Sequence, residues 1–127
     1  MLLLKRVYEG KCTVLPYNFG YFTGFAIFNE REEHVAFSYD ECQRCCENFE
    51  VEWTGVDSID QFYGMTLNSP QIEITQEEED DSKTSVTCKI TSKSKEIICY
   101  VSNEHNGYYA HEVFIAENDD LIHDLVI

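Results

Sequence analysis

Apolar and polar residues alternate with a period of two in several segments of this chain, and this alternation is the feature that most restricts its fold. Phe49, Val51 and Trp53 alternate with polar residues, and similar alternation recurs in residues 84–91 and 96–102. Successive side chains of a β-strand point to opposite faces, so such segments are typical of strands with one buried and one solvated face. The sequence therefore predicts a mainly β protein.

Short polar connections join these segments in pairs. Residues 84–91 and 96–102 flank the sequence Ser-Lys-Ser-Lys, and residues 20–28 and 34–39 flank a polar loop at residues 29–33. Strands that are joined by so few residues pair in antiparallel fashion. We therefore expect two hairpins.

One short helix is expected between the strands. Asp57 or Ser58 can cap its N-terminus and Gly64 can end it. The apolar residues that would share one face of this helix are Ile59, Phe62 and Tyr63. With a further strand in residues 108–115, the predicted fold is mainly β (α+β): a single antiparallel sheet or roll of about six to eight strands with one short helix.

The length of 127 residues and the 43% hydrophobic content predict one domain, residues 1–127, with an ordinary core. Three leucines precede Lys5 and Arg6, which is the reverse of the order in a signal peptide. No apolar run approaches the roughly 20 residues that cross a bilayer. We therefore expect a cytoplasmic protein whose six cysteines are not paired in disulfides.

The formal charge of −15 is distributed unevenly. No basic residue occurs between Arg44 and Lys83 or after Lys95. Because Lys and Arg carry phosphate binding, such a chain should repel nucleic acid and anionic membranes. It should attract a protein with a basic surface, which is the partner that we expect. The alternative is that the charge only keeps a small protein soluble.

The densest acidic segment is predicted to be a surface loop at residues 76–83. The residues that we expect to bind the partner are Glu73, Glu77, Glu78, Glu79, Asp80, Asp81, Tyr108 and Tyr109. The tail, residues 117–127, is apolar near its end. It is expected either to dock on the body of the protein or to bind a partner.

Three cysteines lie close together in residues 42–46. Cys42 and Cys45 have the C-x2-C spacing that supplies two thiolates to zinc, but no second pair of this kind follows. The weak candidates for metal ligands are Cys42, Cys45, Cys46 and His105. A redox pair is disfavoured, because the acids nearby raise thiol pKa values. We expect no metal and no cofactor, with the cysteines packed as small apolar residues.

Residues 102–113, with the sequence SNEHNGYYAHEV, contain an Asn-Gly turn signal. Tyr108 and Tyr109 should lie on opposite faces of a strand, so one of them should be exposed. His111 with Glu112 offers a general base, but no nucleophile motif, phosphate loop or zinc-protease motif accompanies them. Exposed tyrosines beside polar residues are typical of a recognition surface, so we expect no enzyme activity.

The order of these motifs resembles a family of small proteins, met mostly in bacteriophages and their hosts, that is described as a domain of unknown function. Asp40 precedes Cys45-Cys46-Glu47, as an aspartate precedes Cys-Cys-Glu in that family. Residues 56–70 are similar to an acidic passage of the family, and residues 102–113 to its closing Ser-Asn-Gly-Tyr-Tyr hairpin. The extra Cys42, an apparent insertion before Asn-Gly and the additional tail depart from the pattern.

The resemblance implies a β-rich fold and a phage accessory setting, and it supplies no catalytic residue. We therefore interpret the chain as a non-enzymatic, acidic phage-type protein of the bacterial host cytoplasm. It would bind and inhibit a host defence or nucleic-acid-handling enzyme, with DNA mimicry as the mode. Two alternatives stay open: a protein that sequesters a nucleotide-like small molecule, and a zinc-supported structural or enzymatic domain.

Overall fold

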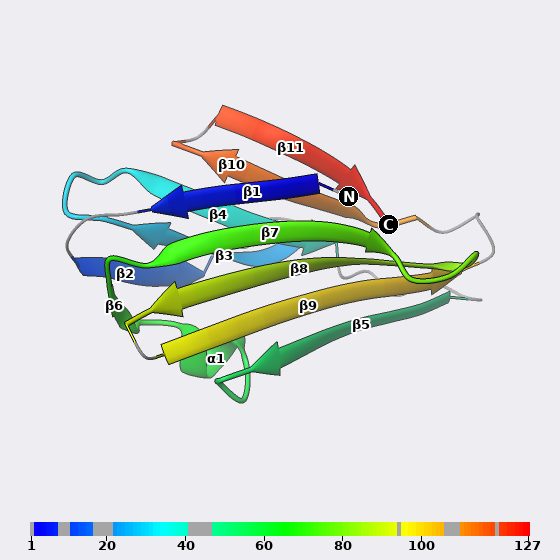
Figure 1. Cartoon of the computed structure of the whole chain (residues 1–127), viewed down its shortest axis with the longest axis horizontal. Coiled ribbons are helices and arrows are strands. Elements are labelled where there is room, and N and C mark those ends of the chain that lie inside the picture. The colour runs from blue at the N-terminus through cyan, green and yellow to red at the C-terminus, as the bar shows by residue number, and fades with distance from the viewer. Residues whose placement is uncertain are drawn as a thin grey trace.

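The chain folds as two antiparallel β-sheets that pack face to face (Figure 1). The computed structural model describes residues 2–7, 11–16, 22–40, 47–93, 95–105, 110–118 and 120–127. These residues contain eleven strands and one short helix. The mainly β class with one short helix is thus confirmed. The strands are more numerous than expected, and they form two sheets and not one. A sheet with one apolar face has to bury that face against another layer, and here the second sheet provides it.

The first sheet has five strands in the order β1-β7-β8-β9-β5, and each neighbouring pair is antiparallel. The strands are β1 (Leu2–Val7), β7 (Gln71–Glu78), β8 (Lys83–Ser92), β9 (Lys95–His105) and β5 (Glu47–Thr54). The hairpin predicted around the Ser-Lys-Ser-Lys segment is formed by β8 and β9. Lys93 has a positive φ of 52° in the tight turn between them.

The second sheet has six strands in the order β11-β10-β4-β3-β2-β6. The strands are β11 (Asp120–Val126), β10 (Glu112–Glu117), β4 (His34–Asp40), β3 (Phe22–Phe28), β2 (Lys11–Pro16) and β6 (Thr66–Asn68). The other predicted hairpin is formed by β3 and β4. Its loop is closed by the Asn29 side chain, whose Oδ1 accepts hydrogen bonds from the backbone N–H groups of Arg31 (2.9 Å) and Glu33 (3.0 Å).

The core lies between the sheets and consists of the alternate, inward-facing residues of their strands. Aromatic rings pack at one end of it: the ring of Phe25 lies 4.9 Å from that of Phe62 and 5.6 Å from that of Trp53. Phe62 belongs to α1 (Ile59–Phe62), and its side chain is fully buried. The short helix therefore closes one end of the sandwich with an aromatic side chain.

The helix differs from the prediction at its end. Ser58 occupies the N-cap without a side-chain hydrogen bond, and the Gln61 side chain accepts the hydrogen bond of the Asp57 backbone N–H instead. Tyr63 leaves the helical conformation, with φ −62° and ψ 128°, and its side chain is exposed. It therefore does not share the buried face of Phe62. Gly64 follows at φ 84°, as expected of a helix-ending glycine.

The acidic segment is more regular than the predicted loop at residues 76–83. Strand β7 continues to Glu78, and the connection to β8 contains residues 79–82 only. Ile72 and Ile74 are buried, and Glu73 between them points to the other face of the sheet. Glutamates are tolerated in this strand because that face is solvated. The acidic composition of the segment therefore does not decide whether it forms a strand or a loop.

The tail docks on the body of the protein, which decides between the two expectations for residues 117–127. Strand β11 pairs with β10, and Leu125 and Ile127 are buried. The strand expected at residues 108–115 begins at Glu112, and residues 106–109 lie outside the described ones. Within the described part of the chain, no helix has the length and apolar character that crossing a bilayer requires.

Candidate functional site

The surface of the five-stranded sheet that points away from the second sheet is here named the acidic face. Its side chains are those that alternate with the buried core residues of β5, β7, β8 and β9. The carboxylates that the register places on this face are Glu50 and Glu52 on β5, Glu73 and Glu77 on β7, and Glu96 and Glu104 on β9. Three of the five strands thus contribute carboxylates to one surface, and the lysines of β8 lie among them.

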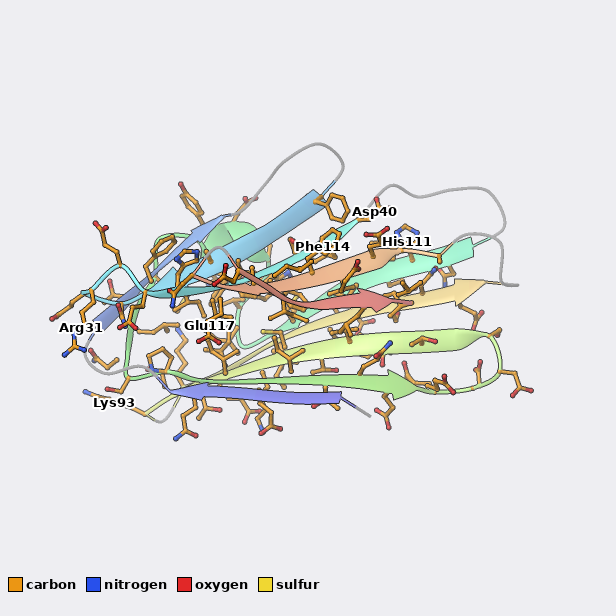
Figure 2. The ribbon with its side chains drawn as sticks, turned by 90° about the horizontal axis from the view of Figure 1, so that it is seen from above. Arg31, Asp40, Lys93, His111, Phe114 and Glu117 are labelled. Carbon is orange, nitrogen blue, oxygen red and sulfur yellow. The ribbon has the colours of Figure 1, made fainter. Side chains whose placement is uncertain are left out.

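The two ends of this sheet differ in charge. The connection between β7 and β8, with Glu79, Asp80 and Asp81, lies at one end, and the turn between β8 and β9 lies at the other (Figure 1). Lys93 occupies that second turn, and Arg31 lies at the same end of the molecule (Figure 2). Within the five-stranded sheet, the negative charge is therefore denser at the end that carries the β7–β8 connection, here named the acidic hairpin (residues 77–83). The loop that contains Arg31 also contains Glu30, Glu32 and Glu33.

The acidic hairpin is held in shape by its own hydrogen bonds. The backbone N–H groups of Glu79 and Asp80 both donate to the Lys83 carbonyl oxygen, at 2.9 and 3.3 Å. The Asp80 carboxylate accepts hydrogen bonds from the backbone N–H (2.9 Å) and the hydroxyl (3.2 Å) of Ser82. The Ser82 backbone N–H in particular lowers the pKa of Asp80, so this carboxylate stays charged at neutral pH. These hydrogen bonds give the hairpin a defined shape within the chain.

Tyr100 anchors the hairpin to the acidic face. Its hydroxyl donates a hydrogen bond to the Glu79 carboxylate. Partial burial, and then this bond to Glu79, raises the pKa of Tyr100, so the phenol stays protonated. Tyr100 and Glu79 in turn raise the pKa of Lys83, which keeps its positive charge. The alternation in residues 96–102 separates Tyr100 from the face that contains Cys99 and Val101, but nothing in the sequence indicates its partner.

The lysines of β8 do not neutralise the whole face. The Lys89 ammonium lies 3.3 Å from the Glu96 carboxylate, and Lys83 lies beside Glu79 and directly opposite Glu104. Glu52 and Glu77 are exposed and have no ion pair within the described part of the chain. A partner with a basic surface would therefore meet carboxylates that are still available.

The structure brings most of the predicted partner-binding residues together. Glu73 and Glu77 lie on the acidic face, Glu78 is exposed at the end of β7, and Glu79, Asp80 and Asp81 form the hairpin loop. Tyr108 and Tyr109 lie outside the described residues. The strand that precedes them nevertheless ends at the acidic hairpin, because Glu104 pairs with Lys83. Whether the tyrosines join this surface stays a prediction.

Five of the six cysteines divide into two sets. The weak candidates for metal ligands lie outside the described part of the structure: this applies to Cys42, Cys45 and Cys46 and to the side chain of His105. The structure therefore does not test the prediction about a metal site. Among the described residues, no group of three or more metal-ligand side chains occurs. Cys88 and Cys99 are buried directly opposite each other on β8 and β9. Burial raises the pKa of Cys88 to about 12 and raises that of Cys99 strongly, so both are inert thiols of the core.

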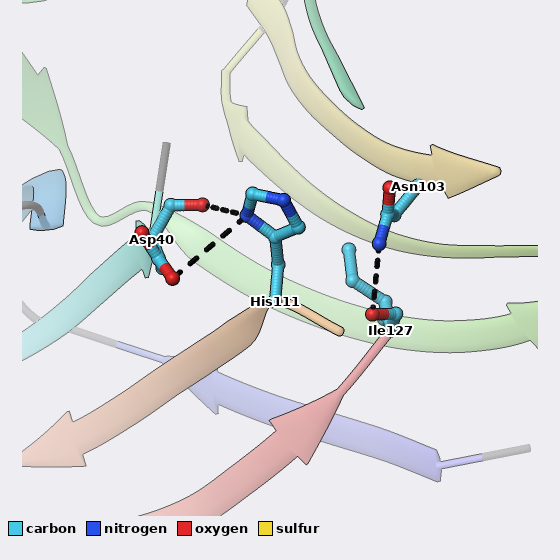
Figure 3. Close-up of polar contacts among 4 residues, drawn as sticks. All are labelled: Asp40, Asn103, His111 and Ile127. Carbon is cyan, nitrogen blue, oxygen red and sulfur yellow. Dashed lines mark hydrogen bonds and ion pairs between the residues drawn. The ribbon is translucent and has the colours of Figure 1, made fainter. Parts of the chain in front are cut away.

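A buried polar cluster joins the two sheets beside the core (Figure 3). The ring of His111 is fully buried, stacks on Phe49 at 4.2 Å, and places Nδ1 within hydrogen-bonding distance of the Asp40 carbonyl oxygen. The Asp40 carboxylate lies 3.9 Å from the same nitrogen. Asp40 and His111 come from two of the sequence motifs described above, and their contact was not predictable from spacing.

The backbone of His111 also holds the tail. Its N–H donates to the Ile127 carbonyl oxygen at 2.8 Å, and the Ile127 N–H donates to the His111 carbonyl oxygen at 2.9 Å. The Asn103 side chain, from β9 of the other sheet, donates to the Ile127 carbonyl oxygen at 3.1 Å. Because the ring has no exposed surface, the geometry supports a role for His111 in joining the sheets and not in taking a proton from a substrate.

Comparison with protein-family models, with curated proteins and with solved structures gave no match for this chain. The resemblance of its motifs to a phage-associated family therefore stays a prediction.

Proposed function

We propose that this chain is a non-enzymatic, acidic phage-type accessory protein that binds a host protein with a basic surface and inhibits it. The observation that carries the proposal is the acidic hairpin, an ordered run of carboxylates at one end of a face that is itself lined with glutamates. A surface whose backbone is already folded before binding loses less conformational entropy on association, which favours tight binding.

The charge spacing favours mimicry of nucleic acid by several strands together. Alternate residues of a strand lie about 6.7 Å apart, whereas each strand of DNA carries one phosphate per about 3.4 Å of helix axis. One row of glutamates therefore has about half the charge density of one DNA strand. On the acidic face, Glu50 and Glu52 have this alternate spacing, whereas the two outward glutamates of β7, and likewise those of β9, are farther apart. The hairpin adds consecutive carboxylates at one end.

The class of target follows from this surface. A basic groove that binds nucleic acid is the complement of such a face, so the target is a defence or nucleic-acid-handling enzyme of the bacterial host. The setting in the host cytoplasm is what the family resemblance implies. The net charge of −15 would speed the encounter by electrostatic steering.

Affinity capture from a bacterial lysate tests this proposal. The variant E77K/E78K/D81K reverses charge in the hairpin while it keeps Glu79, Asp80 and Ser82, which hold the loop. Its matched control, E30K/E112K/D124K, makes the same change of charge at exposed residues of the second sheet and its loop. We expect the wild type and the control to retain one nucleic-acid-binding protein that high salt releases, and the hairpin variant to lose it. Equal capture by both variants would refute the proposed surface.

A further inference from the structure

We propose that the free edge of β5 receives an extended segment of the partner as an additional strand of the five-stranded sheet. This inference rests on the proposed function and adds to it the chemistry of the bound segment. Strand β5 pairs with β9 along all eight of its residues without a shift in register. On its other side, no strand among the described residues pairs with it. Its outward backbone groups are a template for a further strand.

The other three sheet edges fit an added strand less well. Strand β6 has three residues only. The pairing of β11 with β10 shifts register between Ile115 and Ala116, and the Gln76 side chain donates to the Val126 carbonyl oxygen at 3.4 Å. Strand β1 includes Lys5 and Arg6, whose charge would repel a basic partner. The edge at β5 is longer, regular and acidic.

The side chains of β5 specify what the added strand should contain. Glu50 and Glu52 are exposed on the acidic face, and the Glu50 carboxylate accepts a weak hydrogen bond of 3.4 Å from Asn48. On the inner side of the same strand, Phe49, Val51 and Trp53 pack against the core but remain partly exposed. A strand that alternates basic and apolar residues would pair charge with the glutamates and complete the cover over the apolar side chains.

The same side chains disfavour a second copy of this chain at the edge. Two β5 edges that paired with each other would bring glutamates of both copies onto one face, where they would repel. Exposed charge on an edge strand commonly prevents such self-pairing. Here it would also select a basic segment over an acidic one, so the edge discriminates between partners by charge.

A peptide-binding experiment on the full chain tests the inference. The probe is a fluorescent peptide of about ten residues that alternates lysine with valine, long enough to span β5. A second peptide has the same composition with all lysines first, which keeps the charge but removes the alternation. Two further peptides carry N-methyl groups on the lysines or on the valines, which removes every second backbone donor. Fluorescence anisotropy measures affinity, and amide hydrogen exchange reports on residues 47–54.

We expect the alternating peptide to bind at least tenfold more tightly than the block peptide and to protect amides of β5. One of the two N-methylated peptides should lose this advantage, because alternate N–H groups of a strand point to one side. The variant E50K/E52K should lose binding, and its matched control E30K/D124K should keep it.

Three results would overturn the inference, and they have different consequences. Equal binding of the alternating and block peptides without protection of β5 would exclude strand addition and leave the electrostatic proposal intact. No binding of any basic peptide would contradict both strand addition and the acidic face as a binding surface. The third result would be amide protection of β5 that increases with protein concentration in the absence of peptide. It would show that a second copy of the chain occupies the edge.

Discussion

Tyr100 joins the acidic hairpin to the acidic face. Its hydroxyl is a donor to Glu79, and its ring lies on the same face as Lys83. Removal of the hydroxyl would leave the Glu79 carboxylate free to turn toward solvent. The loop itself would keep the backbone bonds to Lys83 and would open more often.

The variant Y100F should therefore destabilise the fold by about 1 kcal/mol and speed amide exchange in residues 79–82. Urea unfolding and amide exchange measure the two effects. The control is Y63F, which removes a hydroxyl from an exposed side chain and should change neither quantity. Unchanged exchange in Y100F would show that the hydroxyl does not hold the loop.

The raised pKa of Cys88 predicts that the stability of the fold depends on pH in the alkaline range. Its pKa is about 12 in the folded chain against an ordinary value of 9.0. A raised pKa means that the folded state binds the proton more tightly, so this stabilisation is complete below pH 9 and is lost as pH rises toward 12. The urea midpoint should fall across that window.

In C88A, the part of the fall in the urea midpoint that this thiol causes should disappear. The pKa values of Cys99 and Tyr100 are also raised, so these two groups should still cause part of the fall with pH. The native wild type should react slowly at Cys88 and Cys99 with a thiol reagent at pH 8, and unfolding in urea should expose both. Rapid reaction of both thiols in the native state would contradict the buried position.

At the scale of the elements, the polar cluster around His111 decides how firmly the tail strand stays docked. His111 contacts Phe49 of the first sheet, and its backbone holds Ile127 after β11. Loss of the ring would leave a cavity beside Phe49 and would remove the contact with Asp40. The tail would then be held mainly by the ladder between β10 and β11.

The variant H111A should cost roughly 2–4 kcal/mol of stability and raise amide exchange in β11 more than in β8. The exposed neighbour offers a control, since E112A should change stability by less than about 0.5 kcal/mol. Urea unfolding with residue-resolved exchange makes the comparison. Equal loss of protection in both strands would mean that the cluster stabilises the whole fold and not the tail.

The strands that could be predicted are apolar or alternating segments that short polar loops bound, and β3 and β4 are buried in continuous runs. The pairs β3–β4 and β8–β9 are adjacent in sequence and have short polar loops, so local pattern was sufficient. The sequence predicts a loop from residue 76 onward, whereas β7 continues to Glu78, because Gln76, Glu77 and Glu78 show no apolar alternation that would indicate a strand. Strands β1 and β6 pair with segments far away in sequence, β7 and β2, which local pattern does not specify.

The candidate site divides in the same way. The acidic residues of the hairpin were predictable, because a dense run of carboxylates has to face solvent. The partnership of Tyr100 with Glu79 and the contact of His111 with Asp40 were not, since each joins segments that only the sheet register brings together. The edge of β5 required knowledge of the strand order in the sheet.

The whole molecule is charged unevenly, and this predicts how its association should depend on salt. Five consecutive carboxylates lie in the acidic hairpin, at residues 77–81, and Lys93 lies in the turn at the other end of the same sheet (Figures 1 and 2). Steering by such a field weakens steeply with ionic strength, because the screening length is about 10 Å at 0.1 M salt and about 3 Å at 1 M. The association rate constant with the captured partner should fall at least tenfold between low and high salt, as stopped-flow mixing would measure.

The most direct test of the proposed function is competition with DNA for the captured host protein. Fluorescent duplex DNA is first bound to that protein, and the acidic protein is then added while anisotropy is followed. We predict that the wild type and E30K/E112K/D124K release the DNA at similar concentrations, and that E77K/E78K/D81K does not release it. If the DNA stayed bound while the acidic protein joined the complex, the acidic face would not occupy the nucleic-acid groove and the mimicry proposal would be wrong.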